Sequence, residues 1–457
     1  MSTLSTLNGR EAEVARIEEL LDKKDLPGLL GFLAGLSIPD LADLLMLLDP
    51  SARVAVFRLL PKAVSSEVFA YLNPSHMNTL LRDLTDQETQ HLLANMRPDD
   101  RTALFEELPG QAIQRLLNLL SPEDRKEALS LLGYPEDSVG RFMTPDYIAV
   151  RPHWTVAQAL EHIRSRGVDS ETIYNIYVTD DSWKLLDDIE LRRLILAAPS
   201  EKIAQIMDNT FVSLNALDDR EQAVGVMERY DVLALPVVDS DGILLGIVTA
   251  DDVFDVAREE ATEDFHKSAA VAPLRTPYHE ANALSLFTSR IGWLVTLVFV
   301  NLASSGVIAL FEKTLASTIA LAFFIPLLID SGGNTGSQSA TLAVRALATG
   351  EVRLSQWFKV LLRELMVGLM LGVAMGLASG LLGIFRGGYQ VGIVVGLSMM
   401  AIVIVANLIG VLLPFLLTRF KLDPAVASSP LITSIADCTG LLIYFSVATW
   451  LLGLPGK

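Results

Sequence analysis

Hydrophobic residues are distributed unevenly along this 457-residue chain. Beyond Arg290 they form long apolar stretches, each of which reaches the roughly 20 residues that a helix needs to cross a bilayer. There are five such stretches, near residues 291–310, 316–343, 361–385, 391–418 and 430–453. The pattern predicts an all-α membrane domain with five transmembrane helices over residues 280–457.

Residues 1–137 alternate short leucine-rich segments with polar ones. Prolines recur at intervals of 24 residues, at Pro50, Pro74, Pro98 and Pro122. Two short amphipathic helices per interval could bury their leucine faces only against neighbouring pairs, which is typical of helical repeat proteins. We therefore predict an α-helical repeat N domain over residues 1–137, suited to a scaffold or sensor.

From residue 138 the pattern changes to short strands alternating with helices, and it occurs twice. RFMTPDYIAV is echoed by QIMDNTFVSL, and the second copy predicts strands at Leu235–Val238 and Ile243–Val248. A helix then opens at Thr249 with Asp252 three residues later, as in a capping box. We predict two α/β domains, over residues 138–199 and 200–260.

An acidic helix should connect these domains to the membrane, over residues 251–275. Its carboxylates Asp252, Asp255, Glu259 and Glu263 are three or four residues apart and so share one face. Like charges at this spacing destabilise a helix. The run is either a solvated acidic face or a cation-binding face, and its place at the membrane entrance favours the second.

Charge follows the same division. The chain has a net charge of −18 and is 51% hydrophobic, with a mean hydropathy of +0.40. Residues 290–457 hold 10 Lys and Arg against 6 Asp and Glu, so residues 1–289 carry −22. Such a field attracts cations and repels nucleic acid. The single cysteine, Cys438, excludes an internal disulfide framework.

The basic residues also predict an orientation. The N-terminal segment has no signal-peptide pattern, and most Arg and Lys flank the predicted spans on the side of the acidic half. The positive-inside rule then places the N-terminal half in the cytoplasm and the C-terminus outside a bacterial inner membrane.

Two parts of the predicted spans stand out from a lipid-facing helix. Gly368, Gly372, Gly376 and Gly380 form a four-residue stripe, which indicates close helix packing. Asp330–Gln338 is rich in polar residues and glycine. Irregular backbone at membrane depth is tolerated only in protein or beside water, so we predict an irregular segment that lines an ion path.

Asp330 and Asp437 are carboxylates well inside predicted spans, where a charge costs roughly 2.5–3.5 kcal/mol. Asp437 is either a pore cation site or a protonated packing contact, and Asp330 is either a second ligand or a cap. All six histidines precede Arg290, and oxygen ligands without imidazole suit hydrated Mg²⁺. Ca²⁺ and Mn²⁺ stay open as alternatives.

The two α/β copies resemble a tandem of CBS domains, with GIVTADD at Gly246–Asp252 as the matching segment. Such pairs often bind adenosine nucleotides, which implies contacts from Tyr174, Arg192 and Thr249. The first copy has Arg193 where the nucleotide-binding pattern has Asp, so the sequence leaves ATP binding open.

The whole chain resembles the MgtE family of bacterial magnesium channels, on the order of its domains and on the segments GGNTGSQ and ADCTGLLIYFSVA. The resemblance implies a homodimer in the lipid bilayer with a central Mg²⁺ pore, gated by cytosolic Mg²⁺ and closed when that ion is abundant. The implied pore residues are Asp437, Thr433, Asn334, Gly333 and Ser337, with Asp330 as a further candidate. The implied regulatory ligands are Glu221, Glu228, Asp231, Asp252, Asp255, Glu260, Glu263, Asp264, Asp99 and Asp100.

Other functions remain as alternatives. One is a membrane-anchored CBS nucleotide sensor that moves no ion, and another is a channel for Mn²⁺ or Co²⁺. We find no nucleophile and base pair and no phosphate loop, so no catalytic residue is predicted and an enzyme is not expected.

Overall fold

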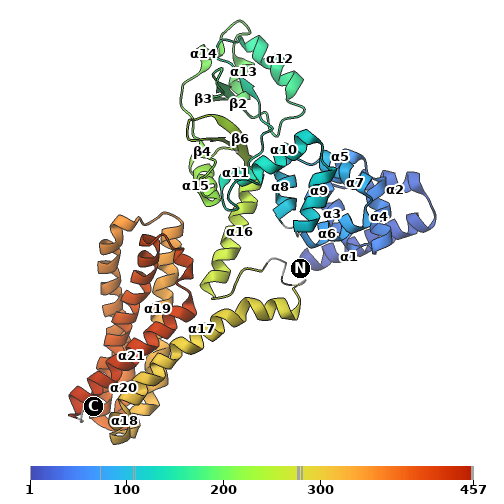
Figure 1. Cartoon of the computed structure of the whole chain (residues 1–457). Helices are drawn as coiled ribbons and strands as arrows, with labels where there is room; N and C mark the ends of the chain where they lie inside the picture. Colours follow the sequence, from blue (N-terminus) through green and yellow to red (C-terminus); the bar gives the residue numbers. More distant parts are fainter. Residues whose placement is uncertain are drawn as a thin grey trace. The chain divides into compact units, whose positions relative to one another are not determined.

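The computed structural model describes residues 2–72, 74–106, 108, 110–274, 278 and 281–453. The chain divides into two compact units, Met1–Ala257 and Arg258–Lys457, whose elements are labelled in Figure 1. The predicted ends at 275, 280 and 454–457 lie outside the described residues.

Among the described residues, ten helices build the first part of unit 1, and four of them begin at the periodic prolines. Proline suits the first turn of a helix, because its missing N–H would have no partner there. Thr85 starts α7 with a capping box to Glu88. The helices are α1 Ser2–Asp22, α2 Leu26–Leu33, α3 Ile38–Leu47, α4 Pro50–Leu59, α5 Lys62–Ala70, α6 Pro74–Asp83, α7 Asp86–Ala94, α8 Pro98–Glu106, α9 Gly110–Leu119 and α10 Pro122–Leu131.

These helices share one leucine-rich core. Leu29, Leu45, Phe69, Leu93 and Phe105 are each almost wholly buried, and they come from five different helices along the array, α2, α3, α5, α7 and α8. Burial of a side chain of this size contributes roughly 1.5–3 kcal/mol. The core therefore depends on contacts between neighbouring helices, as the sequence pattern predicts.

Two small sheets follow, each with one parallel and one antiparallel pairing. Their strand orders are β1-β2-β3 and β4-β5-β6, so the two copies repeat the same topology. The strands are β1 Ala149–Val150, β2 Asn175–Thr179, β3 Leu185–Glu190, β4 Leu214–Asn215, β5 Ala234–Val238 and β6 Leu244–Thr249. The helices are α11 Val139–Phe142, α12 Val156–Arg166, α13 Leu191–Leu196, α14 Ile203–Ile206 and α15 Arg220–Tyr230.

The two sheets are joined across a shared core. Bridges pair Thr144 with Ile247 and Lys184 with Ile243, and the buried side chain of Tyr177 packs with that of Leu244. The first sheet therefore contacts the second, which makes the tandem a packed α/β pair.

The acidic helix α16 spans Ala250–Ser268, so it ends before the predicted residue 275. Ala270 has a φ of +56°, and the N–H of Val271 donates to the carbonyl of His266 at 2.9 Å. A left-handed residue with such a bond is a usual helix ending. The division between the two units falls inside α16.

Unit 2 has four helical stretches long and apolar enough to cross a membrane, among the residues described. One of them, of 66 residues, is far too long for a single crossing. Gly388 interrupts it with a φ of +83°, which gives the five predicted spans. The helices are α17 Ala283–Leu310, α18 Glu312–Ser317, α19 Ile325–Ala348, α20 Trp357–Arg419 and α21 Ser429–Leu452, with short 3-10 turns η1 Ile319–Phe324, η2 Leu354–Gln356 and η3 Pro424–Val426.

The glycine stripe packs as predicted. A Cβ at Gly376 would lie 2.7 Å from the carbonyl oxygen of Gly396, and one at Gly380 would lie 3.2 Å from that of Gly392. The two halves of α20 thus run antiparallel with their backbones almost in contact. Any larger side chain at these positions would separate them.

The predicted irregular segment at Asp330–Gln338 is wrong, because α19 is helical throughout Ile325–Ala348. Its glycines serve packing: a Cβ at Gly333 would lie 2.8 Å from Cγ2 of Thr433. Its hydroxyls are also satisfied: Thr335 Oγ1 donates within the helix to the carbonyl of Ser331 at 2.8 Å, and Ser337 Oγ bonds to α21. In this segment, polar residues together with glycine belong to a closely packed helix, and not to the break that the sequence analysis predicted.

Candidate functional site

The predicted pore residues come from two adjacent helices, α19 and α21. Ser337 Oγ lies 3.3 Å from Thr433 Oγ1, and Asn334 Nδ2 donates to Asp330 Oδ2 at 3.2 Å. Asp437 is near enough to Asp330 for their charges to repel each other. The structure thus brings these five predicted pore residues to one side of the unit, and the sixth, Gly333, is buried against Thr433.

This side, the polar face, consists of Asp330, Asn334, Ser337, Thr433 and Asp437. Asp330 and Asn334 are exposed and the other three are half-buried. Oδ1 of Asp437 is buried and has no hydrogen-bond partner among the residues described. An unpartnered carboxylate oxygen beside hydroxyl and amide oxygens is a suitable ligand for a hard cation.

A third intramembrane carboxylate was missed by the sequence analysis. Glu364 Oε2 accepts from Asn407 Nδ2 at 3.1 Å, and the same amide donates to the carbonyl of Glu364 at 2.7 Å. Ser339 Oγ donates to Asn407 Oδ1. Asn407 thus joins the two halves of α20 through Glu364, and joins α20 to α19 through Ser339. Glu364 lies near the start of its span, so the hydropathy pattern gives no sign of these contacts.

The predicted regulatory residues Asp99 and Asp100 lie in the first turn of α8, and Asp252 and Asp255 in the first turns of α16. Asp99 is only 7% exposed, and its Oδ1 has no partner among the described residues. Burial, with the nearby charges of Asp252 and Asp100, raises the pKa of Asp99 well above its usual range.

Asp252, in the first turn of α16, is also in a buried and acidic environment. Burial raises the pKa of Asp252 to about 7, although Thr249 Oγ1 donates to its carboxylate and opposes the shift. That bond is 2.6 Å long. Burial also raises the pKa of Asp100, against the charge of Arg97. The two helix starts therefore hold carboxylates that resist ionisation.

Two further acids of this group were not predicted. Burial raises the pKa of Glu171, and the charge of Asp251 adds to the effect. Glu171 forms an ion pair with Arg97, and the positive charge of Arg97 lowers the repulsion among these carboxylates. We call the group the acidic cluster: Asp99, Asp100, Glu171, Asp251, Asp252 and Asp255.

The acidic cluster is not a closed metal cage. Nowhere in the described part of the chain do three His, Cys, Asp or Glu side chains converge as metal ligands. The carboxylates repel one another without sharing a centre. They could bind cations that keep much of their water, as Mg²⁺ usually does.

The remaining predicted regulatory residues lie elsewhere. Glu221, Glu228 and Asp231 are exposed on α15 and at its end, and Asp231 closes that helix with a φ of +52°. Within unit 2, Glu260, Glu263 and Asp264 lie in the second half of α16.

The end of α16 is tied to the loop between α20 and α21. Lys267 Nζ lies 2.6 Å from Asp423 Oδ2 and 2.6 Å from Glu263 Oε1. Burial and the charge of Asp423 raise the pKa of Asp264, while Lys267 opposes the shift. Lys267 thus ties the acidic helix to the α20–α21 loop through Asp423, while its contact with Glu263 lies within α16.

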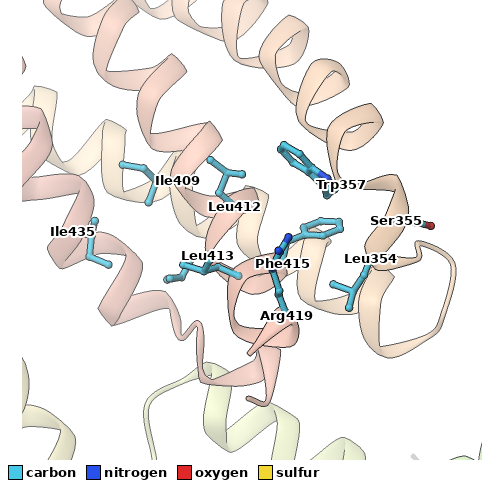
Figure 2. A pocket seen from close by; sticks show the side chains of 10 residues that line it. Leu354, Ser355, Trp357, Ile409, Leu412, Leu413, Phe415, Arg419 and Ile435 are labelled. Carbon is cyan, nitrogen blue, oxygen red and sulfur yellow. The ribbon is translucent and has the colours of Figure 1, made fainter. Parts of the chain in front are cut away.

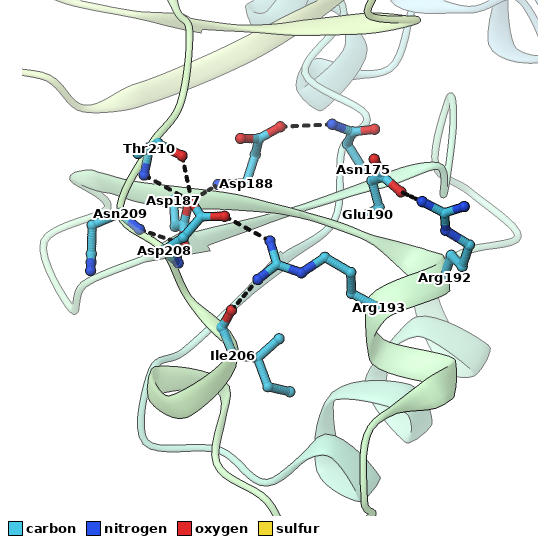
Figure 3. Close-up of polar contacts among 10 residues, drawn as sticks. All are labelled: Asn175, Asp187, Asp188, Glu190, Arg192, Arg193, Ile206, Asp208, Asn209 and Thr210. Carbon is cyan, nitrogen blue, oxygen red and sulfur yellow. Dashed lines mark hydrogen bonds and ion pairs between the residues drawn. The ribbon is translucent and has the colours of Figure 1, made fainter.

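The candidate nucleotide contacts are spread over the α/β pair. Tyr174 is 65% exposed, Arg192 pairs with Glu190 at 3.1 Å, and Thr249 bonds to Asp252. Figure 3 shows that Arg193 bonds to the Asp208 carboxylate and the Ile206 carbonyl. Arg193 therefore secures the segment after α14.

Sequence profiles match three parts of the chain. They describe a divalent cation transporter, MgtE, over residues 325–447, the MgtE intracellular N domain over 36–137, and CBS domains over 139–199 and 203–259. Together they cover more than half of the chain.

Solved structures agree for the soluble part. The cytosolic domain of the Mg²⁺ channel MgtE in complex with ATP is 36% identical with a TM-score of 0.51, and covers 53% of this chain and 99% of its own. The soluble part of a magnesium transporter is 29% identical with a TM-score of 0.53, and covers 55% of this chain and 99% of its own.

The sequence matches to two curated relatives extend from the N-terminal domains into the membrane domain. The magnesium transporter MgtE of Thermus thermophilus is 43% identical over 326 residues, which are 71% of this chain and 72% of the relative. That of Bacillus subtilis is 35% identical over 320 residues, 70% of each chain. At this identity and coverage, with matching N, CBS and membrane segments, the chain belongs to the MgtE family.

Proposed function

We propose that this protein moves Mg²⁺ across a bacterial inner membrane along the polar face of α19 and α21. The observation that carries the proposal is Asp437, an intramembrane carboxylate whose buried Oδ1 lacks a partner among the described residues. The Thermus thermophilus and Bacillus subtilis relatives are named magnesium transporters. Asp437, Thr433, Ser337, Asn334 and Gly333 would contact the ion or its water, with Asp330 beside them.

The donor chemistry of the polar face supports Mg²⁺. Its side chains offer carboxylate, hydroxyl and amide oxygens, which suit a hard cation that keeps several waters. Zn²⁺ and Cu²⁺ favour imidazole or thiolate, and histidine is absent from residues 290–457. Mn²⁺ and Co²⁺ are the competing cargoes, to be separated by a competition assay.

We further propose that two copies meet along the polar face. Asp330 and Asn334 are exposed in one chain, and hydrocarbon solvates neither of them. A second polar face opposite the first would enclose a wet path with two Asp437 carboxylates. A homodimer therefore supplies the environment that a single chain lacks.

Gating would follow from the acidic residues. At low cytosolic Mg²⁺ the carboxylates of the acidic cluster repel one another, so the soluble domains separate and the pore opens. When Mg²⁺ is abundant, ions bridge these surfaces and Glu221, Glu228 and Asp231, and α16 holds the pore closed. The ions need supply only the difference in free energy between the two states.

This scheme requires the soluble half to face the cytoplasm. The basic residues that flank the spans on that side support the orientation, by the positive-inside rule. With five spans, the C-terminus would then lie outside.

The test is Mg²⁺ flux in proteoliposomes at varied internal Mg²⁺. Wild-type flux should fall as internal Mg²⁺ rises, whereas a variant with Asp255→Asn, Glu260→Gln and Glu263→Gln should keep its flux. A matched triple variant of exposed acids away from α16, with Glu67→Gln, Glu161→Gln and Asp181→Asn, should behave as wild type. Unchanged inhibition in the α16 variant would remove that helix from the gate, and no flux at all would favour a membrane-anchored nucleotide sensor.

A second candidate activity is ATP binding by the CBS pair, through Tyr174, Arg192 and Thr249. The relative solved in complex with ATP supports it, while the engagement of Arg192 and Arg193 with acidic partners opposes it. Calorimetric titration of the full chain with ATP should give a heat that Tyr174→Ala reduces. A flat titration would withdraw the proposal.

A further inference from the structure

Unit 2 contains a cavity of about 770 Å³ that the ion path does not use. Figure 2 shows its lining, which comes from both ends of α20, from η2 and from α21. The lining residues are Leu354, Ser355, Trp357, Ile409, Leu412, Leu413, Phe415, Leu416, Arg419 and Ile435. A volume of this size is within the range of small-molecule sites.

The cavity is apolar along its length and charged at one end. Its last helical stretch runs from Ile409 to Arg419, which at 1.5 Å per residue is about 15 Å, or half of the roughly 30 Å hydrocarbon core. Leu412 and Leu416 are 40% and 50% exposed. The apolar length therefore matches the acyl region of one leaflet.

Arg419 and Trp357 lie where a lipid headgroup would be expected. The guanidinium of Arg419 has no hydrogen bond or ion pair within the part of the chain that the structure describes. Trp357 is 45% exposed and its ring packs against Phe358. Tryptophan and arginine are typical of the membrane interface, and basic pockets between helices on the cytoplasmic side recognise anionic headgroups.

The position of Ile435 separates the cavity from the polar face. Ile435 is two residues from both Thr433 and Asp437, about 200° around a helix with 3.6 residues per turn. The cavity and the polar face thus lie on opposite sides of α21. If two copies meet along the polar face, a step that rests on the proposed function, the cavity faces lipid.

We propose that this cavity binds an anionic phospholipid of the cytoplasmic leaflet, with the phosphate at Arg419 and an acyl chain along Leu412, Leu416 and Ile409. The charge of Arg419 complements the phosphate, and the exposed leucines bury their surface against the chain. Such a lipid would bind beside the pore helices without entering the ion path.

Native mass spectrometry of the full-length chain, with equal amounts of phosphatidylglycerol and phosphatidylcholine, tests the proposal. The wild type should retain phosphatidylglycerol in excess. Arg419→Gln should lower the retained phosphatidylglycerol about fivefold, roughly 1 kcal/mol, and leave phosphatidylcholine unchanged. Arg386→Gln, which removes an exposed arginine outside the cavity, is the matched control and should change neither lipid.

Leu412→Trp fills the cavity and should lower the binding of both lipids. Equal losses in Arg419→Gln and Arg386→Gln would overturn the proposal in favour of unspecific charge attraction. A change from dimer to monomer in Leu412→Trp with unchanged lipid binding would overturn it in favour of a second copy as the occupant. Mg²⁺ flux, measured in parallel, distinguishes the two proposals: lipid loss with normal flux supports the lipid site, and absent wild-type flux contradicts the proposed function alone.

Discussion

The acidic cluster of unit 1 and the polar face of unit 2 both hold a buried carboxylate oxygen that has no hydrogen-bond partner among the described residues, yet their surroundings differ. In the acidic cluster six carboxylates gather near one arginine, Arg97, that pairs with Glu171. On the polar face Asp437 has mainly hydroxyl and amide groups beside it. In the proposed function, the first arrangement would store repulsion that a cation removes, while the second would offer weak ligands from which an ion can also leave, as conduction requires.

The largest effect is expected on the polar face. Asp437→Asn should lower Mg²⁺ flux in proteoliposomes by about tenfold or more, which corresponds to about 1.4 kcal/mol or more, because the path loses the charge that attracts the ion. Glu312→Gln, at an exposed carboxylate of α18, should leave flux unchanged. Wild-type flux in Asp437→Asn would show that the polar face is not the ion path, and would contradict the division into a gating region and a conducting region.

A smaller effect is expected from the acidic cluster. Asp99→Asn removes a buried carboxylate that lacks a partner in the described structure, and burial of an unpaired charge is costly. We expect the free energy of unfolding without Mg²⁺ to rise by about 1 kcal/mol, and the extra stability that Mg²⁺ provides to shrink. Thermal unfolding at zero and high Mg²⁺ measures both. Asp181→Asn, at an exposed acid, is the control, and an unchanged Mg²⁺ response in Asp99→Asn would contradict the prediction.

The smallest predicted effect is a dependence on pH. The pKa of Asp252 is about 7 in the folded chain, above the value near 3.9 of an unfolded Asp. Between these values the folded chain binds more protons, so its stability without Mg²⁺ should rise as the pH falls from about 7 toward 4. Asp252→Asn should reduce this slope in urea unfolding, and an equal slope in both proteins would contradict the assignment.

Much of the fold follows from local patterns. Pro50, Pro74, Pro98 and Pro122 begin helices because proline suits the first turn, and Gly376 meets Gly396 because small residues let backbones approach. In the second copy, β5 and β6 were predicted to within one residue at each end, whereas the two-residue β4 was not predicted. These predictions were right because the conformation follows from the chemistry of the residue itself.

The failures arose where the cause lay in a distant partner. The glycines of α19 indicated a break, but helices α20 and α21 pack against them and keep α19 regular. Glu171 lies in a loop with no motif, and it reaches the acidic cluster only through the tertiary fold. Untested assignments, such as Glu228 and Asp231 as ligands, stay predictions.

Lys267 gives the proposed gate a set point. Its ammonium already lies between Glu263 and Asp423, where a divalent ion would otherwise have to neutralise them. In the proposed gate, a resident cation of this kind would favour the docked helix at every Mg²⁺ concentration, so fewer ions would be needed to complete closure. The charge of this lysine would thus help to determine the cytosolic Mg²⁺ concentration at which import stops.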